Sequence, residues 1–481
     1  MKKTQTVKKI AVRSVAALIV GVPLFLRANV LVSPLFTANA VLQRETTVPV
    51  WGSAAPGEKV TVTFTGQNQE TVADSSGRWE VRLTPMPANA RGTLTVRGKN
   101  TVELTNVVTG DVWLCAGQSN MGLKVSDATN GPTEVAAANQ PDIRQFHLPE
   151  NPKPETETDA GLKTVWQPAN PQTAGDFSAV GYFFAREIQA ALDVPVGLIN
   201  CSVGGAPIQS WMAVDVLETF PGYHQVLNQL RLNPNPPVSA TLLPARLYNG
   251  MIHPLIRYRI KGALWYQGEG NAGSGAHGAQ EYTDLQCRLI ESWRKDWNLG
   301  DFPFYFVQLP NWSYPGDASQ KSWAFFREGQ ANCLKTPNTG MIVTLDIGDS
   351  GSLHPKNKQA VGYRLALVAR AATYHQPVAA SGPVMSGSTV EKNVVRVRFD
   401  YAEGGLMVLS GASPSGFEIA GPDGKFFPAT AVMNHDAVLV SSPEVPSPAY
   451  VRYAWANNPS VNLCNDAGLP AAPFRTDQLL R

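Results

Sequence analysis

Three short segments of the sequence carry the side chains that ester hydrolysis requires. They are Gly117-Gln118-Ser119-Asn120-Met121, Gln267-Gly268-Glu269-Gly270-Asn271 and Leu353-His354-Pro355. A serine hydroxyl is a poor nucleophile at neutral pH, so it needs an adjacent base and hydrogen-bond donors for the oxyanion. The segments offer the Ser119 hydroxyl, the His354 imidazole and the Asn271 amide, and together they indicate a serine hydrolase.

Ser119 has the sequence context of a nucleophile. It follows the apolar run 112–116 after only two residues, so its hydroxyl is expected at a strand-to-helix turn. Gly117 permits the tight turn, and the Ser119 backbone N–H at a helix start is a candidate oxyanion donor. The alternative is that Ser119 or Asn120 only caps the helix. The segment lacks the second glycine of Gly-x-Ser-x-Gly and follows the first strand of its domain, which argues against the common nucleophile elbow.

Two glycine-rich segments follow other predicted strands. The pair Gly204-Gly205 comes shortly after the apolar run 196–200 and predicts backbone donors for the oxyanion, with a plain turn as the alternative. Gly268 begins a G-x-G-x-x-G pattern, which also occurs in dinucleotide sites. That fingerprint needs a helix at its third glycine, whereas residues 274–278 predict a flexible loop. We therefore expect no dinucleotide, and predict that Asn271 donates to the oxyanion while Glu269 orders the loop or a neighbour.

His354 is the candidate base among seven histidines. It follows the apolar run 341–345, and Pro355 suits the first turn of a helix that runs through 359–373. A helix N-terminus disfavours the imidazolium and would keep this base neutral. The sequence has no H-E-x-x-H, paired C-x-x-C or Walker pattern, so neither a metal nor another cofactor is predicted.

Apolar patterning divides the chain into four predicted segments. These are a leader at 1–28, an N-terminal β-sandwich module at 29–107, a catalytic domain at 108–375 and a C-terminal β module at 376–481. In both β modules apolar and polar residues alternate between turns, as in antiparallel strands. In the catalytic domain, unbroken apolar runs at 112–116, 196–200, 260–266, 304–309 and 341–345 are joined by segments that include helical patterns at 180–192 and 282–297. This predicts an α/β domain with a doubly wound, mostly parallel sheet, whose ligands bind at the carboxyl ends of the strands.

The leader has the composition of a secretory signal. Its six basic residues, absence of acids and short apolar run at 14–26 predict export to the periplasm or the extracellular space, without stable membrane insertion after processing. We favour cleavage near residue 28 over the better-formed pattern Ala38-Asn39-Ala40, because residues 31–52 look folded. An uncleaved anchor is the alternative. Removing the leader leaves 34 basic and 38 acidic residues, a net charge of −4, so nothing favours a nucleic-acid partner.

The composition is that of a globular, turn-rich protein, with 43% hydrophobic and 16% charged residues. Its five widely spaced cysteines are not a disulfide framework. Cys115 and Cys201 lie at the ends of two predicted strands and could lie close together. We interpret both as buried apolar thiols.

The chain resembles the sialate O-acetylesterase family of carbohydrate esterases, a branch of the SGNH (GDSL-like) hydrolases. The resemblance rests on Val41-Leu42-Gln43-Arg44, on 110–121, on Leu247-Tyr248-Asn249-Gly250-Met251, on 265–269, on 354–359 and on Gly468-Leu469-Pro470. It implies a flavodoxin-like catalytic domain with flanking β modules and no cofactor. It also implies that Ser119 is the nucleophile, that His354 is the general base and acid, and that Ser119, Gly204, Gly205 and Asn271 form the oxyanion hole. Candidates for the substrate pocket are Gln118, Gln267, Trp211 and Asn249, although we favour a core position for Trp211.

Two positions depart from the family pattern. Family members commonly carry an aspartate two or three residues before the histidine, where this chain has Ser352 and Gly351. Asp346, Asp349 or Glu269 could take its place, or a backbone carbonyl could hold the ring in a Ser–His dyad. In addition, Gly270 stands where a serine is usual, which could enlarge the pocket or loosen Asn271.

The resulting hypothesis is an exported esterase that removes O-acetyl groups from sugars, sialate being the first candidate, through an acetyl-serine intermediate. An acetylxylan or other plant-polysaccharide esterase is the close alternative, because the reacting acetyl ester is the same. The alternative from another class is a carbohydrate-binding protein with an inactive hydrolase domain.

Overall fold

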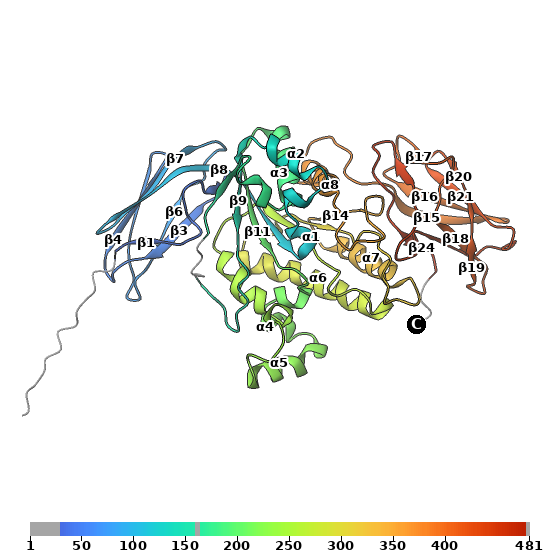
Figure 1. Ribbon diagram of the computed structural model, residues 1–481, viewed down its shortest axis with the longest axis horizontal. Helices are drawn as coiled ribbons and strands as arrows, with labels where there is room; N and C mark the ends of the chain where they lie inside the picture. Colours follow the sequence, from blue (N-terminus) through green and yellow to red (C-terminus); the bar gives the residue numbers. More distant parts are fainter. Residues whose placement is uncertain (1–28, 159–163, 478–481) are drawn as a thin grey trace, which may run out of the picture.

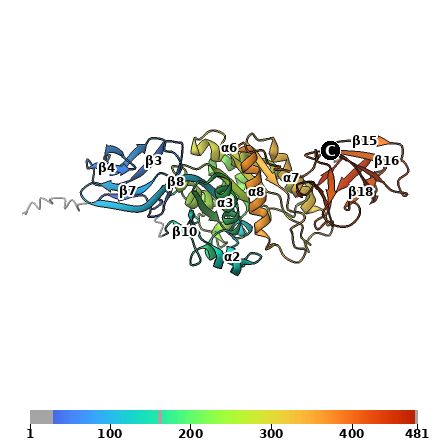
Figure 2. The same ribbon diagram turned by 90° about the horizontal axis from the view of Figure 1, so that it is seen from above.

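The computed structural model describes residues 29–158 and 164–477, which form three parts arranged in a row (Figures 1 and 2). A β module at the N-terminal end and another at the C-terminal end flank a central α/β part. The predicted leader at 1–28 lies outside the described residues. Among the helices that the structure describes, none combines the length and the apolar character needed to cross a membrane.

The central part is built on a sheet with the strand order β10-β9-β11-β8-β12-β13-β14. Its strands are β8 (Thr101–Gly117), β9 (Gln140–His147), β10 (Gln167–Ala169), β11 (Val196–Ser202), β12 (Gly262–Tyr266), β13 (Phe304–Val307) and β14 (Thr339–Ile342). All neighbours along this path are parallel except β10, which pairs antiparallel to β9. The chain passes from β8 to one side and returns across it to β12, so a topological switch point lies at the carboxyl end of β8.

The five predicted strands of this sheet are present, but β9 was not predicted. Its sequence Gln-Pro-Asp-Ile-Arg-Gln-Phe-His has no apolar run, yet Arg144 and Gln145 are buried. The Arg144 guanidinium donates to the carbonyl oxygens of Asn39 and Asn106, at 3.0 and 2.6 Å. These hydrogen bonds offset the cost of burying its charge. Partners distant in sequence therefore make a polar strand compatible with burial.

Helices cover both faces of the sheet. Helices α3 (Ala179–Leu192) and α8 (Lys358–Ala372) pack on one face, and α6 (Gly275–Trp297) and α7 (Ser322–Asn332) on the other (Figure 1). Successive side chains of a strand enter the two cores in turn, as Leu264 of β12 lies in one core and Trp265 in the other. This two-sided burial explains the unbroken apolar runs of the sequence.

Helix α6 begins earlier in the chain than the sequence predicts. Residues 274–278 were expected to be a flexible loop, but α6 begins at Gly275, so they form its first turn. Glycines at 275 and 278 lower the local helix propensity, and the long packed helix that follows overrides it. The G-x-G-x-x-G segment is thus followed by a helix.

The N-terminal module consists of two groups of strands around one core. One sheet contains β1 (Leu31–Val32), β3 (Val48–Ser53) and β6 (Arg78–Leu83), and the other strands are β2 (Val41–Gln43), β4 (Lys59–Phe64), β5 (Gln67–Val72) and β7 (Arg91–Arg97). Strands β2 and β7 pair with β8, which then continues into the central sheet. The predicted boundary at 107/108 therefore falls inside one continuous strand.

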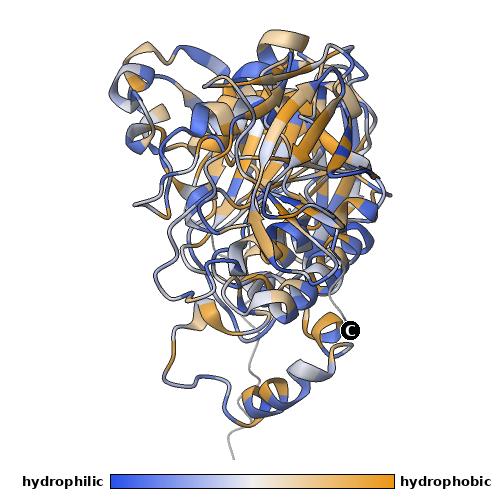
Figure 3. Ribbon diagram, turned by 90° about the vertical axis from the view of Figure 1, so that its right-hand side faces the viewer, coloured by the Kyte–Doolittle hydropathy of each residue, from blue (hydrophilic) through white to orange (hydrophobic). Residues whose placement is uncertain are grey.

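The C-terminal module is antiparallel throughout its described strand pairs. Its sheets contain β15 (Val384–Glu391), β16 (Val394–Asp400), β20 (Thr430–Asn434) and β21 (Ala437–Ser441); β18 (Phe417–Ala420), β19 (Phe426–Pro428), β22 (Tyr450–Tyr453) and β24 (Phe474–Arg475); and β17 (Leu406–Val408) with β23 (Leu463–Asn465). Figure 3, seen from this end, shows hydrophobic residues gathered mostly in the strands and hydrophilic residues in the outer loops. A separate core includes Val397, Ile419 and Val451.

The predicted proximity of Cys115 and Cys201 is confirmed, because they lie one residue out of register on paired strands. Cys115 and Cys201 lie on the neighbouring strands β8 and β11, but their side chains enter cores on opposite faces of the sheet. Both are fully buried, and burial raises the pKa of the Cys115 thiol to about 12, which confirms the interpretation as apolar thiols. Cys287 of α6 and Cys333 after α7 approach each other, with 2.9 Å between their sulfur atoms.

Candidate active site

Ser119 stands directly beyond the carboxyl end of β8, at the switch point of the sheet. It is the first residue of the four-residue helix α1 (Ser119–Gly122). Gly117 has a φ of +134°, and a Cβ there would lie 2.2 Å from the Tyr266 carbonyl oxygen. The predicted need for glycine at this turn is confirmed, because β8 and β12 approach too closely for any side chain.

His354 lies next to Ser119, with 2.7 Å between His354 Nε2 and Ser119 Oγ. The histidine is on the long loop between β14 and α8 and is exposed to solvent. The expectation of a helix starting at Pro355 is wrong, since α8 begins at Lys358 with Asn357 as its N-cap. The pKa of His354 is nevertheless below the ordinary histidine value, first through desolvation and second through the positive charge of Lys358. A neutral imidazole can accept the serine proton.

The three candidate acids all make other contacts. Asp346 forms a two-point ion pair with the Arg364 guanidinium. The Asp349 carboxylate accepts from the Gly351 backbone N–H at 2.9 Å, and Glu269 accepts from Asn120. Within residues 29–158 and 164–477, no carboxylate is hydrogen-bonded to His354.

Ser352, which occupies a place where the family commonly has an acid, serves the histidine backbone instead of the ring. Its Oγ accepts from the His354 N–H at 3.1 Å. The described arrangement is therefore a Ser–His pair whose histidine is held through its loop.

A buried polar network connects the three loops of the site. Asn120 donates through Nδ2 to Glu269 Oε1 at 2.5 Å and to the Leu353 carbonyl oxygen at 3.0 Å. Its Oδ1 accepts from Lys358 Nζ at 2.6 Å. The Lys358 ammonium also lies 4.9 Å from the centre of the Tyr266 ring. Asn120 thus ties the nucleophile turn to the loop after β12 and to the residue that precedes His354.

The ionisable members of this network have shifted pKa values. Burial raises the pKa of Glu269, although the Asn120 hydrogen bond and the charge of Lys358 act against the shift. Burial lowers the pKa of Lys358 to about 7, against the opposing effect of Glu269. The second carboxylate oxygen of Glu269 is buried without a partner among the described residues. Both groups are consequently sensitive to any change in the other.

Backbone N–H groups beside Ser119 are available for an oxyanion. A Cβ on Gly204 would lie 4.0 Å from the Ser119 Cβ, so this glycine adjoins the nucleophile. Gly205 has a φ of +70°, a conformation that glycine favours. In the part of the chain that the structure describes, the N–H groups of Gly204 and Gly205 have no acceptor. Ser119, at the start of α1, adds a third N–H that has no intrahelical partner.

Asn271 lies on the adjacent loop and is tightly held. Its Oδ1 accepts from the Ile208 N–H at 2.9 Å and from Gln267 Nε2 at 2.8 Å, while its Nδ2 donates to Gln209 Oε1 at 3.1 Å. One of the two Nδ2 hydrogens is thereby engaged. Gly270, its neighbour, packs against the Gly205 carbonyl oxygen, which would lie 3.1 Å from an added Cβ.

The glycine pattern after β12 is explained by Gln118. The N–H groups of Gly268 and Gly270 point to Gln118 Oε1, at 3.4 and 3.2 Å. They brace the nucleophile turn, and their direction toward a protein side chain is the structural reason against a dinucleotide site. Within the described residues, no group of three or more His, Cys, Asp or Glu side chains is arranged to hold a metal ion.

The other candidates for the substrate pocket are all buried. Trp211 is fully buried and packs edge-on against Trp265, as expected of a core residue. Gln267 accepts from the Tyr282 hydroxyl at 2.8 Å. Asn249 lines a cavity beside Leu227 and donates to the Pro154 carbonyl oxygen at 2.9 Å. Of these three side chains, Gln267 is the one that contacts the loops of the site, because its Nε2 donates to Asn271 Oδ1 at 2.8 Å.

Two residues of the site were missed by sequence reasoning, namely Asn120 and Lys358 in their connecting roles. Lys358 lies on the buried face of α8 with Val361 and Leu365, three and seven residues further along. A lysine on the apolar face of an amphipathic helix is the signal that could have identified it.

These features define a class of protein: an α/β protein with a Ser–His pair at the switch point of its mostly parallel sheet. The comparison with known families agrees. The family model for "carbohydrate esterase, sialic acid-specific acetylesterase" matches residues 109–370, and the chain belongs to this family. It is therefore a carbohydrate esterase.

Relatives and a solved structure support the assignment. The chain is 32% identical to the sialate O-acetylesterase of Mus musculus, over 69% of this chain and 72% of the relative. It is 34% identical to the sialate O-acetylesterase of Homo sapiens, over 70% of this chain and 69% of the relative. A crystal structure of a carbohydrate acetylesterase from Xanthomonas citri has 38% identity and a TM-score of 0.87, and the match covers 94% of this chain and 100% of that one.

Proposed function

We propose that the protein removes O-acetyl groups from sugars through an acetyl-serine intermediate, with O-acetylated sialic acids as the first candidate substrates. The observation that carries the proposal is the 2.7 Å contact between His354 Nε2 and Ser119 Oγ, beside the unpaired N–H groups of Gly204 and Gly205. The substrate class is supported by the mammalian sialate O-acetylesterases that the chain resembles. We assign the central domain to the flavodoxin-like SGNH hydrolases on its strand order.

The chemistry follows in two steps. Ser119 Oγ attacks the acetyl carbonyl carbon while its proton passes to His354 Nε2. The oxyanion of the tetrahedral intermediate accepts from the N–H groups of Ser119, Gly204 and Gly205, with the remaining Asn271 hydrogen as a fourth candidate. Collapse transfers the proton from His354 to the sugar oxygen and leaves acetyl-Ser119. Water then attacks with His354 as base, and acetate is released.

Ser119→Ala tests the nucleophile. We expect p-nitrophenyl acetate hydrolysis to fall by at least about 10³-fold, because the hydroxyl that forms the intermediate is gone. Circular dichroism and the melting temperature should match those of the unmodified protein. A fluorophosphonate probe should label the unmodified protein and not the variant. Retained hydrolysis or unchanged labelling would reject Ser119.

Substrate identity is tested by acetate release from acetylated sialic acids, xylans and pectins. The proposal expects the highest kcat/KM on an acetylated sialic acid. A clear preference for acetylated xylan would be compatible with the proposed mechanism but would contradict sialic acid as the substrate.

We also propose that the protein is exported, on the basic and apolar pattern of residues 1–28. Mass spectrometry of the mature N-terminus tests this. Cleavage near residue 28 is expected, and retention of Met1 in the purified, fully active protein would contradict it.

A further inference from the structure

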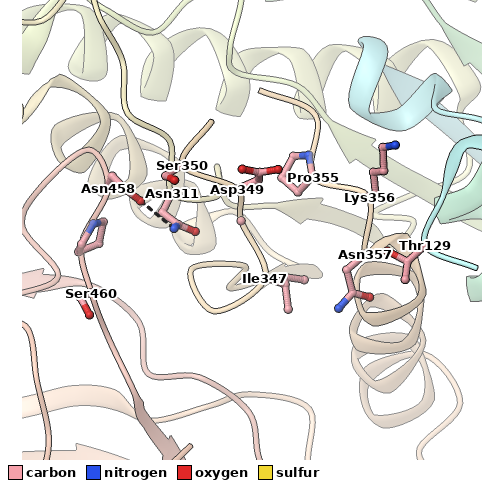
Figure 4. Close-up of a pocket in the computed structure, with 12 residues that line it drawn as sticks. Thr129, Asn311, Ile347, Asp349, Ser350, Pro355, Lys356, Asn357, Asn458 and Ser460 are labelled. Carbon is pink, nitrogen blue, oxygen red and sulfur yellow. Dashed lines mark hydrogen bonds between the residues drawn. The ribbon is translucent and has the colours of Figure 1, made fainter. Parts of the chain in front are cut away.

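A polar cavity lies beside the catalytic loop, where the central part meets the C-terminal module (Figure 4). Its volume is about 650 Å³. Pro355 and Lys356, which directly follow His354, line one side, and Asn458 and Ser460 of the C-terminal module line another. The cavity is therefore one residue away from the catalytic histidine along the chain.

The lining has the chemistry of a site for sugar hydroxyls. It is made largely of amides, hydroxyls and one carboxylate, from Asn311, Asp349, Ser350, Asn357, Asn458 and Ser460. Such groups can donate to and accept from neighbouring hydroxyls of one sugar. The single acid of the lining, Asp349, is matched by the single base, Lys356, so the cavity suits an uncharged ligand.

An aromatic loop continues from this lining. Asn311 is followed by the half-buried residues Trp312 and Tyr314, whose ring centroids are 5.2 Å apart with planes at 31°. A Cβ on Gly273 would lie 2.9 Å from the Tyr314 hydroxyl oxygen, so the loop reaches the segment that carries Asn271. Residues 311–316 therefore extend from the polar cavity to the oxyanion side of the site. Aromatic faces beside polar groups are typical of carbohydrate sites, because they cover the apolar C–H face of a sugar.

The C-terminal module holds this loop in place. Asn458 accepts through Oδ1 from Asn311 Nδ2 at 2.9 Å, as Figure 4 shows, and donates through Nδ2 to Ser313 Oγ at 3.2 Å. The Trp312 N–H donates to the Asn457 carbonyl oxygen at 3.2 Å. The Asn457 side chain also accepts from the Trp323 N–H at 2.9 Å. The module is thus part of the wall of the site and not only an appended domain.

We propose that the cavity and the loop 311–316 form a glycan subsite, which binds an uncharged sugar residue adjacent to the acetylated one. The C-terminal module supplies the far wall through Asn458 and Ser460. The inference rests on the proposed esterase function, because it places the acetylated sugar at Ser119. It predicts that the enzyme acts faster on acetylated oligosaccharides than on the corresponding acetylated monosaccharide.

The experiment compares kcat/KM for these two substrates in two sugar series, acetylated sialosides and acetylated xylo-oligosaccharides. The unmodified protein should favour the oligosaccharide at least about fivefold in the series that it hydrolyses best, which is the effect of one hydrogen bond. Asn458→Ala removes two side-chain contacts, and Ser460→Phe fills the cavity. Both should reduce this preference about fivefold or more, mainly through KM for the oligosaccharide.

Asn434→Ala is the matched control, an exposed asparagine of the same module at the end of β20. It should leave the preference unchanged. Melting temperatures establish that Asn458→Ala and Ser460→Phe are folded, and Ser460→Phe keeps the test valid if Asn458→Ala disturbs the loop.

Equal kcat/KM for monosaccharide and oligosaccharide in the unmodified protein would overturn the subsite, as would an unchanged preference in both folded variants. Absence of p-nitrophenyl acetate hydrolysis in the unmodified protein would instead reject the esterase function on which the subsite rests.

Discussion

Lys358 Nζ donates a hydrogen bond to Asn120 Oδ1 at 2.6 Å, and this contact joins helix α8 to the residue after Ser119. Asn120 passes the connection on to the carbonyl oxygen of Leu353, directly before His354. Ser119 and His354 are thereby both next in the chain to residues joined by this buried amide. Among the described residues no carboxylate is hydrogen-bonded to the histidine ring, and under the proposed mechanism we expect this shared anchor to supply the positioning that an acid usually gives.

The acid limb of the pH–rate profile should lie below the ordinary histidine range. The pKa of His354 is lowered from 6.5 by desolvation and by the charge of Lys358, and only the neutral ring accepts the serine proton. The kcat/KM for p-nitrophenyl acetate should therefore reach half its maximum below pH 6.5. In Lys358→Met the midpoint should move to higher pH, because the repelling charge is removed. Lys335→Met, at an exposed lysine, is the control, and an equal shift in both variants would contradict the assignment.

Stability should respond to pH through Lys358. Its pKa is about 7 in the folded protein against 10.5 for an ordinary lysine, so between these values the unfolded chain binds a proton that the folded protein does not. The free energy of unfolding gains a contribution that rises with pH across this window. Urea denaturation at pH 7, 8.5 and 10 should show that the free energy of unfolding of the unmodified protein increases relative to that of Lys358→Met as the pH rises. Removing Lys358 also raises the pKa of Glu269, because an opposing positive charge is lost. This makes Lys358→Met less stable as the pH rises, and so it increases the same difference in the free energy of unfolding. A difference that decreases with pH would refute the buried lysine.

Asp346 should prove structural. Asp346→Asn breaks the two-point pair with Arg364, whose side chains are 12% and 10% exposed, and should lower the free energy of unfolding by about 2–3 kcal/mol. The midpoint of the acid limb should not change, because Asp346 does not contact His354. A matched Asp436→Asn at an exposed turn should alter neither quantity. A shift of the midpoint by about one pH unit or more in Asp346→Asn would instead identify this carboxylate as the acid that supports the histidine.

Restoring the usual serine at position 270 should impair the enzyme. A Cβ there would lie 3.1 Å from the Gly205 carbonyl oxygen and 3.4 Å from that of Ala206, so it would displace the glycine pair beside Ser119. We expect kcat for p-nitrophenyl acetate to fall about tenfold, less than for the complete loss of an oxyanion donor. Gly222→Ser is the control, since a Cβ there meets no atom within 4 Å. An unchanged or higher kcat would show that the Gly204-Gly205 segment does not set the rate.

Cys287 should be the most reactive thiol in the reduced protein. Its hydrogen bond with Cys333 lowers its pKa to about 7, whereas burial raises the pKa values of Cys115 and Cys201. Mass spectrometry after brief iodoacetamide treatment at pH 7 should find Cys287 modified first. Cys333→Ala removes the hydrogen-bond partner and should slow this modification about tenfold. Faster labelling of Cys115 would contradict the buried arrangement.

The sequence by itself determined the residue types and their places at the ends of strands. Unbroken apolar runs identify strands buried on both faces, and the side chains that follow them must meet at one edge of a parallel sheet. Ser119, Gly204, Glu269 and His354 were found in this way, because the pattern is local. The polar strand β9 was not, since the partners that allow Arg144 to be buried are 38 and 105 residues away.

Only the tertiary structure decided which of these side chains touch. The contacts from His354 to Ser119, from Lys358 to Asn120 and from Asn120 to Glu269 span 235, 238 and 149 residues. Such contacts depend on how α8 and the loop before it pack beside the sheet, and no local propensity encodes this. For the same reason the sequence left Asp346 open as a partner of His354, whereas folding places it on Arg364. The sequence specifies the chemistry of each residue, but the packing of the fold determines which residues are hydrogen-bonded to each other.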